Sequence, residues 1–93
     1  MYKHIVVEFI DNLKLNYHDG DNLNHTARIA AKRICKSTKD AGVFVSVNKA
    51  GSDAIDLVIG NRSKRELQVY TINYKTCGGE LVAECDVNNP VVL

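Results

Sequence analysis

Imidazole and carboxylate side chains cluster between residues 18 and 25, and together they are common metal ligands. His18, Asp21 and His25 could converge across one turn, but their spacing matches no metal-binding motif. A calcium loop that began at Asp19 would need a glutamate at its twelfth position, where the chain has Ala30. We therefore expect turn-forming and helix-capping roles for these residues, and no metal site.

The cysteines are Cys35, Cys77 and Cys85. Zinc sites usually bring cysteines in closely spaced pairs, and small secreted domains usually carry an even set of disulfides. His25 is too far along the chain from Cys35 to act as a local base for that thiol. We expect free, buried or half-buried thiols in a reducing compartment, with a disulfide or redox role as the alternative.

No motif for covalent or phosphate chemistry occurs elsewhere in the chain. The sequence contains no glycine-rich phosphate loop, no serine nucleophile elbow and no paired-histidine helix. A domain of 93 residues buries roughly 60–65% of its unfolded surface, so a deep substrate pocket would compete with the core for apolar side chains. We expect a binding module without a cofactor, and a small metal- or cysteine-dependent enzyme is the remaining alternative.

One segment, residues 23–40, combines apolar side chains at helical spacing with an unmixed run of positive charge. No carboxylate occurs between Asn24 and Lys39. Like charges one turn apart disfavour an isolated helix by about 0.2–0.5 kcal/mol per pair, so the run indicates an acidic partner. An ordinary solvated helix face is the alternative interpretation. The expected partner-binding residues are Arg28, Lys32, Arg33, Lys36 and Lys39.

Overall charge favours a protein partner over free nucleic acid. Twelve Lys and Arg residues against eleven Asp and Glu residues leave a net charge of +1, whereas nucleic-acid-binding domains are usually clearly basic. Glu80, Glu84 and Asp86 gather in the last part of the chain, and a two-sided charge distribution suits an oriented protein–protein encounter. We expect a protein or ribonucleoprotein with an acidic surface. Binding of helix 23–40 to nucleic-acid phosphates is the alternative.

Hydrophobic periodicity predicts the elements that must position this helix. Apolar residues at helical spacing predict a first helix over residues 2–13, although its β-branched residues leave a strand as the alternative. Leu15 and Tyr17 then suggest an extended exit. We expect Gly42 to end the second helix, residues 23–40. Candidate N-caps for that helix are Asp21, Asn22 and Asn24.

The rest of the chain predicts antiparallel strands. Alternating apolar residues mark strands over 43–47, 55–59 and about 66–77, with a loop at 49–53 and a turn at 60–64. Gly78 and Gly79 predict a two-residue hairpin whose register pairs Cys77 with Glu80 and Tyr70 with Val87. Leu67 and Val69 depart from the alternation and predict a bulge or a second burial near residue 68.

These elements predict a single α+β domain over residues 1–93. Its two N-terminal helices pack on one face of a four-stranded antiparallel meander. Tyr70 and Tyr74 would face the helices, which favours core packing over base stacking. With no apolar run of about 20 residues and no recognisable signal peptide, we expect a soluble protein of the cytoplasm without membrane contact. An exposed edge strand or the tail 91–93 could also support a homo-oligomer.

In size, α+β build and lack of a catalytic signature, the chain resembles small proteins encoded by phages and mobile elements. Many of these proteins inhibit host machinery, including CRISPR effectors and restriction systems, by occupying a binding surface. The resemblance covers general form and transfers no residues. It implies a non-enzymatic binding module that modulates or inhibits a macromolecular partner, of the anti-CRISPR or anti-restriction type.

Overall fold

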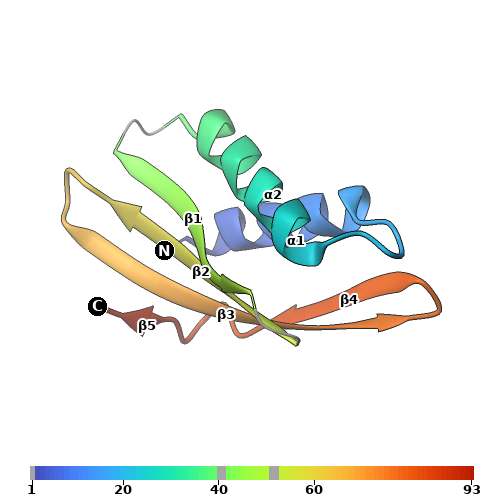
Figure 1. Ribbon diagram of the computed structural model, residues 1–93. Coiled ribbons are helices and arrows are strands. Elements are labelled where there is room, and N and C mark those ends of the chain that lie inside the picture. Colours follow the sequence, from blue (N-terminus) through green and yellow to red (C-terminus); the bar gives the residue numbers. More distant parts are fainter. Residues whose placement is uncertain (1, 40–41, 51–52) are drawn as a thin grey trace.

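Two helices cover one face of an antiparallel sheet (Figure 1). The computed structural model describes residues 2–39, 42–50 and 53–93. The sheet has the order β1-β2-β3-β4, and a short β5 also pairs with β3, so the predicted architecture is confirmed and extended by one strand. The elements are α1 (Lys3–Asn16), α2 (Leu23–Ser37), β1 (Val43–Ala50), β2 (Ala54–Asn61), β3 (Glu66–Cys77), β4 (Glu80–Cys85) and β5 (Val91–Val92).

Helix α1 confirms the helical interpretation of the first segment and excludes the strand alternative. The helix continues through Leu15 to Asn16, and the chain becomes extended only at Tyr17, so the predicted extended exit is wrong. Leu13 is fully buried, whereas Leu15 is 78% exposed. Two residues apart on a helix point to nearly opposite sides, so these leucines look alike in sequence but differ in burial.

Helix α2 begins at the predicted type of cap. The Asn22 side chain accepts a hydrogen bond of 3.2 Å from the backbone N–H of His25, which satisfies one of the free donors of the first turn. The buried face is made mostly of alanines, whose small side chains let the helix lie close to its neighbours. The buried residues of α2 are Ala27, Ala30, Ala31 and Ile34.

The end of α2 corrects the predicted boundary. The helix stops at Ser37 and the chain is extended at Thr38, so Gly42 does not terminate it, and residue 40 lies outside the described residues. Gly42 serves a close approach instead: a Cβ there would lie 2.6 Å from Asn61 Oδ1. That oxygen accepts hydrogen bonds from the backbone N–H groups of Ser63 and Lys64 and closes the turn between β2 and β3.

The last hairpin has the predicted register from Cys77↔Glu80 to Ile72↔Cys85. Gly78 and Gly79 have φ angles of +61° and +81°, as a type I′ turn requires at both central positions. The predicted pair of Tyr70 with Val87 does not form, because β4 ends at Cys85. Beyond that point the chain turns back, and the residues predicted as a tail pair with β3 as β5.

The sheet irregularity lies in β1 and not in β3. Strand β3 pairs with β2 without interruption, so the predicted bulge near residue 68 is wrong, and the register instead shifts between Val47 and Lys49. Gln68 is buried, and its side-chain oxygen accepts a 2.6 Å hydrogen bond from Tyr70 Oη. That bond makes the burial of a polar side chain tolerable. Leu67 and Val69 are half-buried on the outer face, so the alternative expectation, a second burial near residue 68, is confirmed.

Two strand boundaries also differ from expectation. Strand β1 continues through Ala50, so the predicted loop at 49–53 begins later, and residues 51–52 lie outside the described residues. Strand β2 continues through Asn61, which shortens the predicted turn at 60–64. In the described part of the chain, neither α1 nor α2 combines the length and apolarity that a membrane-spanning helix needs.

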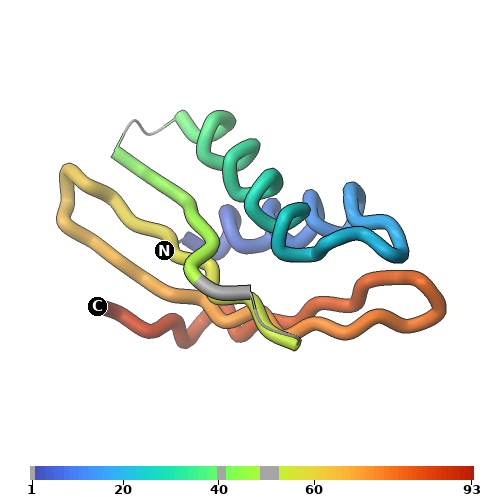
Figure 2. Tube along the Cα trace, in the orientation of Figure 1, coloured from blue at the N-terminus to red at the C-terminus, as the bar shows by residue number. Residues whose placement is uncertain are grey.

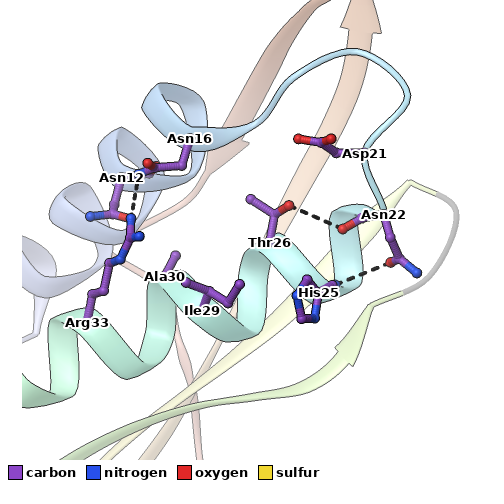
Figure 3. A pocket seen from close by; sticks show the side chains of 9 residues that line it. All are labelled: Asn12, Asn16, Asp21, Asn22, His25, Thr26, Ile29, Ala30 and Arg33. Atoms are coloured by element: carbon purple, nitrogen blue, oxygen red, sulfur yellow. Dashed lines mark hydrogen bonds between the residues drawn. The ribbon is translucent and has the colours of Figure 1, made fainter.

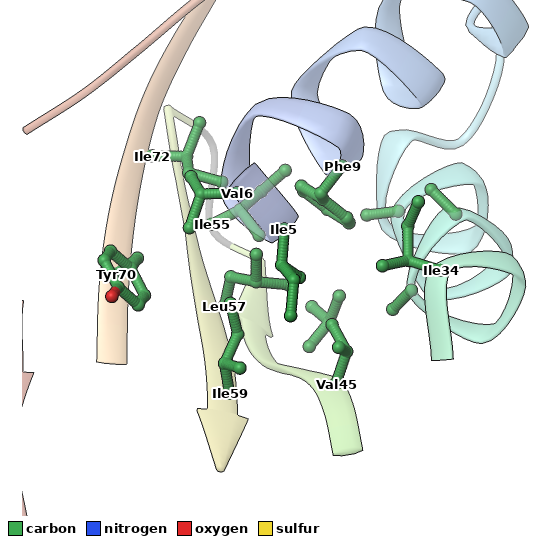
Figure 4. Close-up of a cluster of buried hydrophobic side chains, with 14 of the residues drawn as sticks. Ile5, Val6, Phe9, Ile34, Val45, Ile55, Leu57, Ile59, Tyr70 and Ile72 are labelled. Atoms are coloured by element: carbon green, nitrogen blue, oxygen red, sulfur yellow. The ribbon is translucent and has the colours of Figure 1, made fainter. Parts of the chain in front are cut away.

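The core lies between the helices and the inner sheet face (Figure 4). Strand β2 supplies its centre with Ile55, Leu57 and Ile59, which are fully buried. Tyr70 is 1% exposed and Tyr74 packs against the same cluster, so core packing of these tyrosines is confirmed. Burial raises the pKa of the Tyr70 phenol, although a hydrogen bond from the backbone of Tyr2 opposes the shift.

The burial of α1 gives a matched pair of variants. Leu13→Ala should lower the free energy of unfolding by about 2–5 kcal/mol, because it opens a cavity in the core. Leu15→Ala should change it by about 0.5 kcal/mol or less, as is usual for surface substitutions. Urea unfolding followed by circular dichroism measures both, and similar losses for the two variants would contradict the helical assignment.

Candidate functional site

Helix α2 carries most of the predicted partner-binding residues on its solvent side. Arg28, Lys32, Arg33 and Lys36 lie within the helix and are exposed. Lys39 is also exposed, but it follows the end of the helix, so it does not share the helical spacing assumed for it. The helix itself contains no acidic residue. We call Arg28, Lys32, Arg33 and Lys36 the cationic face of α2.

The cationic face spreads over two flanks. Arg28 and Lys32 line a groove of about 440 Å³ between α2 and β1. Arg33 lines a different groove, of about 300 Å³, between α2 and α1. The row of cations at four-residue spacing, Arg28, Lys32 and Lys36, therefore begins beside the sheet. Arg33 lies on the side of α2 that faces α1. Only the packing of α2 against two neighbours reveals this division.

Arg28 is held toward the sheet by two hydrogen bonds. Its Nε donates to Asn24 Oδ1 at 3.1 Å, and its Nη1 donates to the carbonyl oxygen of Val47 at 3.4 Å. The second bond is long, which makes it a weak contact. The guanidinium thus lies at the rim of the β1 groove, where its remaining N–H groups are available to a carboxylate or phosphate.

The groove between the helices is polar, and its polar groups bond mainly to one another (Figure 3). Asn16 Nδ2 donates to the carbonyl oxygen and the side-chain oxygen of Asn12, at 2.8 and 3.1 Å. Thr26 Oγ1 donates to the carbonyl oxygen of Asn22. The Arg33 side chain reaches across toward Asn12 (Figure 3). Each of these hydrogen bonds lies within one helix or its cap, so the polar groups of the groove are satisfied locally.

The histidine and aspartate cluster has the expected turn-forming geometry. Asp21 Oδ2 accepts a 2.9 Å hydrogen bond from the backbone N–H of His18, and Asn22 caps α2 through His25. Across the described ranges, no three His, Cys, Asp or Glu side chains are grouped closely enough to hold a metal ion.

The three thiols are free and lie in different surroundings. Cys35 and Cys85 are half-buried as expected, whereas Cys77 is exposed because it lies next to the tip of the last hairpin. Burial is the main cause that raises the pKa of Cys85, and the neighbouring Asp86 carboxylate adds to the shift. A raised pKa keeps the thiol protonated and unreactive at neutral pH.

A second cationic cluster, which the sequence interpretation missed, lies at the turn between β2 and β3. Arg62, Lys64 and Arg65 are exposed there. The backbone N–H of Arg62 donates to the carbonyl oxygen of Gly42 at 2.9 Å, so this turn lies beside the residue that precedes β1. The Arg62 guanidinium lies 5.3 Å from the centre of the Phe44 ring, within cation–π distance.

The opposite end of the molecule collects acidic side chains. The tip of the β3–β4 hairpin approaches the loop between the helices (Figure 2), and a Cβ on Gly79 would lie 4.0 Å from Asp19 Cβ. The carbonyl oxygen of Asp53 accepts a hydrogen bond from the N–H of Tyr74, which brings the β1–β2 loop to the same end. Glu80 is exposed beside the tip. Asp19, Asp53 and Glu80 therefore lie near one end of the molecule, where the exposed Lys75 of β3 also lies.

The thiol environments predict a difference in alkylation. At neutral pH, iodoacetamide should modify Cys77 faster than Cys85, because Cys85 is half-buried and its pKa is raised. The Cys85 rate should keep rising with pH until the solution passes its raised pKa. Mass spectrometry of variants that retain a single cysteine measures both rates. Faster modification of Cys85 than of Cys77 at neutral pH would show that Cys85 is an activated thiol.

Comparison of the chain with protein-family models, curated proteins and solved structures finds no match. The cationic face of α2 and the β1 groove beside it are the surface features that bear on function.

Proposed function

We propose that the protein is a non-enzymatic binding module that modulates or inhibits a macromolecular partner by occupying an acidic surface on it. The partner is a protein or a ribonucleoprotein. The observation that carries the proposal is the cationic face of α2, four exposed basic side chains on a helix without an acidic residue. We further propose that the inhibition is of the anti-CRISPR or anti-restriction type, in keeping with the general resemblance to phage-encoded proteins.

The cationic face has an energetic cost that an acidic partner would offset. Arg28, Lys32 and Lys36 follow one another at intervals of one helical turn, and like charges at that spacing destabilise a helix by about 0.2–0.5 kcal/mol per pair. Carboxylates or phosphates on a partner would turn this repulsion into attraction. The positive charge of α2 would also steer the encounter with an acidic surface and raise its rate at low salt.

An apolar side chain within the cationic face favours a protein surface. Ile29 is 37% exposed, and it lines both grooves that flank α2. An isolated phosphate backbone offers no apolar contact for such a residue, whereas the centre of a protein interface is typically apolar with a polar rim. Ile29 surrounded by cations fits that pattern.

The proposed location is the cytoplasm. The three cysteines are free, and unpaired thiols persist in a reducing compartment.

Charge reversal tests the proposed surface. A pull-down from the native host lysate, with and without nuclease, first identifies the partner by mass spectrometry. The double variant Lys32→Glu/Lys36→Glu should then weaken its binding at least about tenfold, because close charge pairs at interfaces couple by about 1.5 kcal/mol or more. The control Lys3→Glu/Lys75→Glu makes the same change in net charge at exposed sites outside α2. Unchanged affinity for the α2 variant would contradict the proposal.

Binding of α2 to nucleic-acid phosphates is the second candidate, favoured by the regular spacing of the cations. In that case, affinity for single- or double-stranded DNA or RNA should be measurable at about 50 mM salt and fall steeply as salt is raised. Ile29→Ala should leave the affinity for the oligonucleotide unchanged, whereas it should lower the affinity for a protein partner. Fluorescence anisotropy with labelled oligonucleotides measures both, and no binding at the lower salt concentration would exclude this candidate.

A further inference from the structure

Strand β1 forms an edge of the sheet that is open along part of its length. It pairs with β2 on one side, and no described strand pairs with its other side. Proteins usually protect such edges with a bulge, a charged side chain or a covering element. Here the register shift between Val47 and Lys49 interrupts one end, and α2 lies along the rest without pairing with it.

The ladder geometry identifies which backbone groups point outward. The N–H of Arg62 donates to the carbonyl oxygen of Gly42, so this position is a hydrogen-bonded pair. Because such pairs alternate along an antiparallel ladder, Val43, Val45 and Val47 direct their N–H and C=O groups away from β2. The bond from Arg28 to the carbonyl oxygen of Val47 is consistent with that direction.

The open edge borders the groove that Arg28 and Lys32 line. Val45 and Val47 line the groove from β1, and Ile29 and Ala31 add apolar surface from α2. The volume of about 440 Å³ lies within the usual range for ligand sites, about 300–1,000 Å³. The groove thus combines free backbone hydrogen-bonding groups, apolar side chains and positive charge.

Cation spacing in this groove matches the repeat of an extended chain. Helix α2 runs back along β1, since Arg28 contacts Val47 while the end of α2 connects to the start of β1. Arg28 and Lys32 are one turn apart, a rise of about 6 Å along the helix. Alternate residues of a strand are about 6.6 Å apart. Two carboxylates on alternate residues of a strand would therefore lie beside Arg28 and Lys32.

We propose that the open edge of β1 binds an extended acidic segment of the partner as an additional antiparallel strand. Its backbone pairs with Val43 and Val45, and acidic side chains on alternate residues face Arg28 and Lys32. This inference rests on the proposed function and specifies how the acidic surface is engaged. Strand addition of this kind takes its affinity from backbone hydrogen bonds and its selectivity from alternate side chains.

Charge complementarity favours this occupant over a second copy of the chain. Pairing of two β1 edges would bring Arg28 and Lys32 of both copies toward one interface, where like charges oppose association. An acidic segment neutralises the same side chains. Nucleic acid would neutralise them too, but it has no peptide backbone with which to continue the sheet.

A labelled synthetic peptide of about seven residues that alternates Glu and Val, long enough to span the open edge, tests the inference. Three forms are compared by fluorescence anisotropy: unmodified, N-methylated on every Glu, and N-methylated on every Val. In an antiparallel pair, residues whose side chains face α2 also direct their backbone toward β1. Methylation of Glu should therefore weaken binding at least about tenfold, through the loss of hydrogen bonds worth about 1 kcal/mol each. Methylation of Val should have little effect.

Protein variants and hydrogen exchange locate the bound peptide. Arg28→Glu should weaken binding of the unmodified peptide far more than Lys75→Glu, because Lys75 is exposed on β3 and lies outside both α2 and the groove lining. NMR hydrogen exchange should show that the amides of Val43 and Val45 become protected when the peptide binds.

Three results would overturn strand addition: no binding at millimolar peptide, equal affinity for both methylated forms, or protection of Val45 that grows with protein concentration without peptide. The last would identify a second copy as the occupant. The proposed function is judged separately, because the Lys32→Glu/Lys36→Glu variant tests the cationic face with the partner itself. Loss of partner binding in that variant, together with a negative peptide result, would support the proposed function and rule out only the addition of a strand to β1.

Discussion

Strand β3 runs the length of the sheet, and its register holds the other strands in place. Its first part pairs with β2 and, on the other side, with β5, while its last part pairs with β4. A shift of one residue would turn every side chain of a strand to the other face and would expose Tyr70 and Ile72, both now buried. The hydrogen bond between Tyr70 and Gln68 lets the alternation continue through a polar residue, so β3 stays regular.

A regular sheet face lets α2 lie close to β1 with mostly alanine side chains. Because those small residues fill the buried side, the long basic side chains are left on the solvent side and at the rim of the β1 groove. The same alternation that sends the side chains of Val43 and Val45 into the core directs their backbone groups to the open edge. Core packing and the proposed binding edge are therefore two consequences of one strand geometry.

Much of the fold follows from local sequence patterns. The periodicity of α1, the cap at Asn22 and the Gly78–Gly79 turn are local features whose stereochemistry is nearly independent of the remaining chain, and the structure confirms them. Boundaries were less predictable: α1 runs past Leu15, and Gly42 does not end α2. Leu13 is buried and Leu15 is exposed, and Gly42 lies close to Asn61 rather than at a helix end; local spacing shows neither placement.

The sequence by itself determined the order of the elements, the register of the last hairpin and the positive charge of the second helix. These depend on residue spacing within one element or one turn. Only the tertiary structure decided that Arg28 and Lys32 lie beside an open strand edge, that Arg33 faces α1, and that the turn carrying Arg62 adjoins Gly42 just before β1. Such placements join segments separated along the chain, and they arise from the packing of helix on sheet, which local periodicity does not specify.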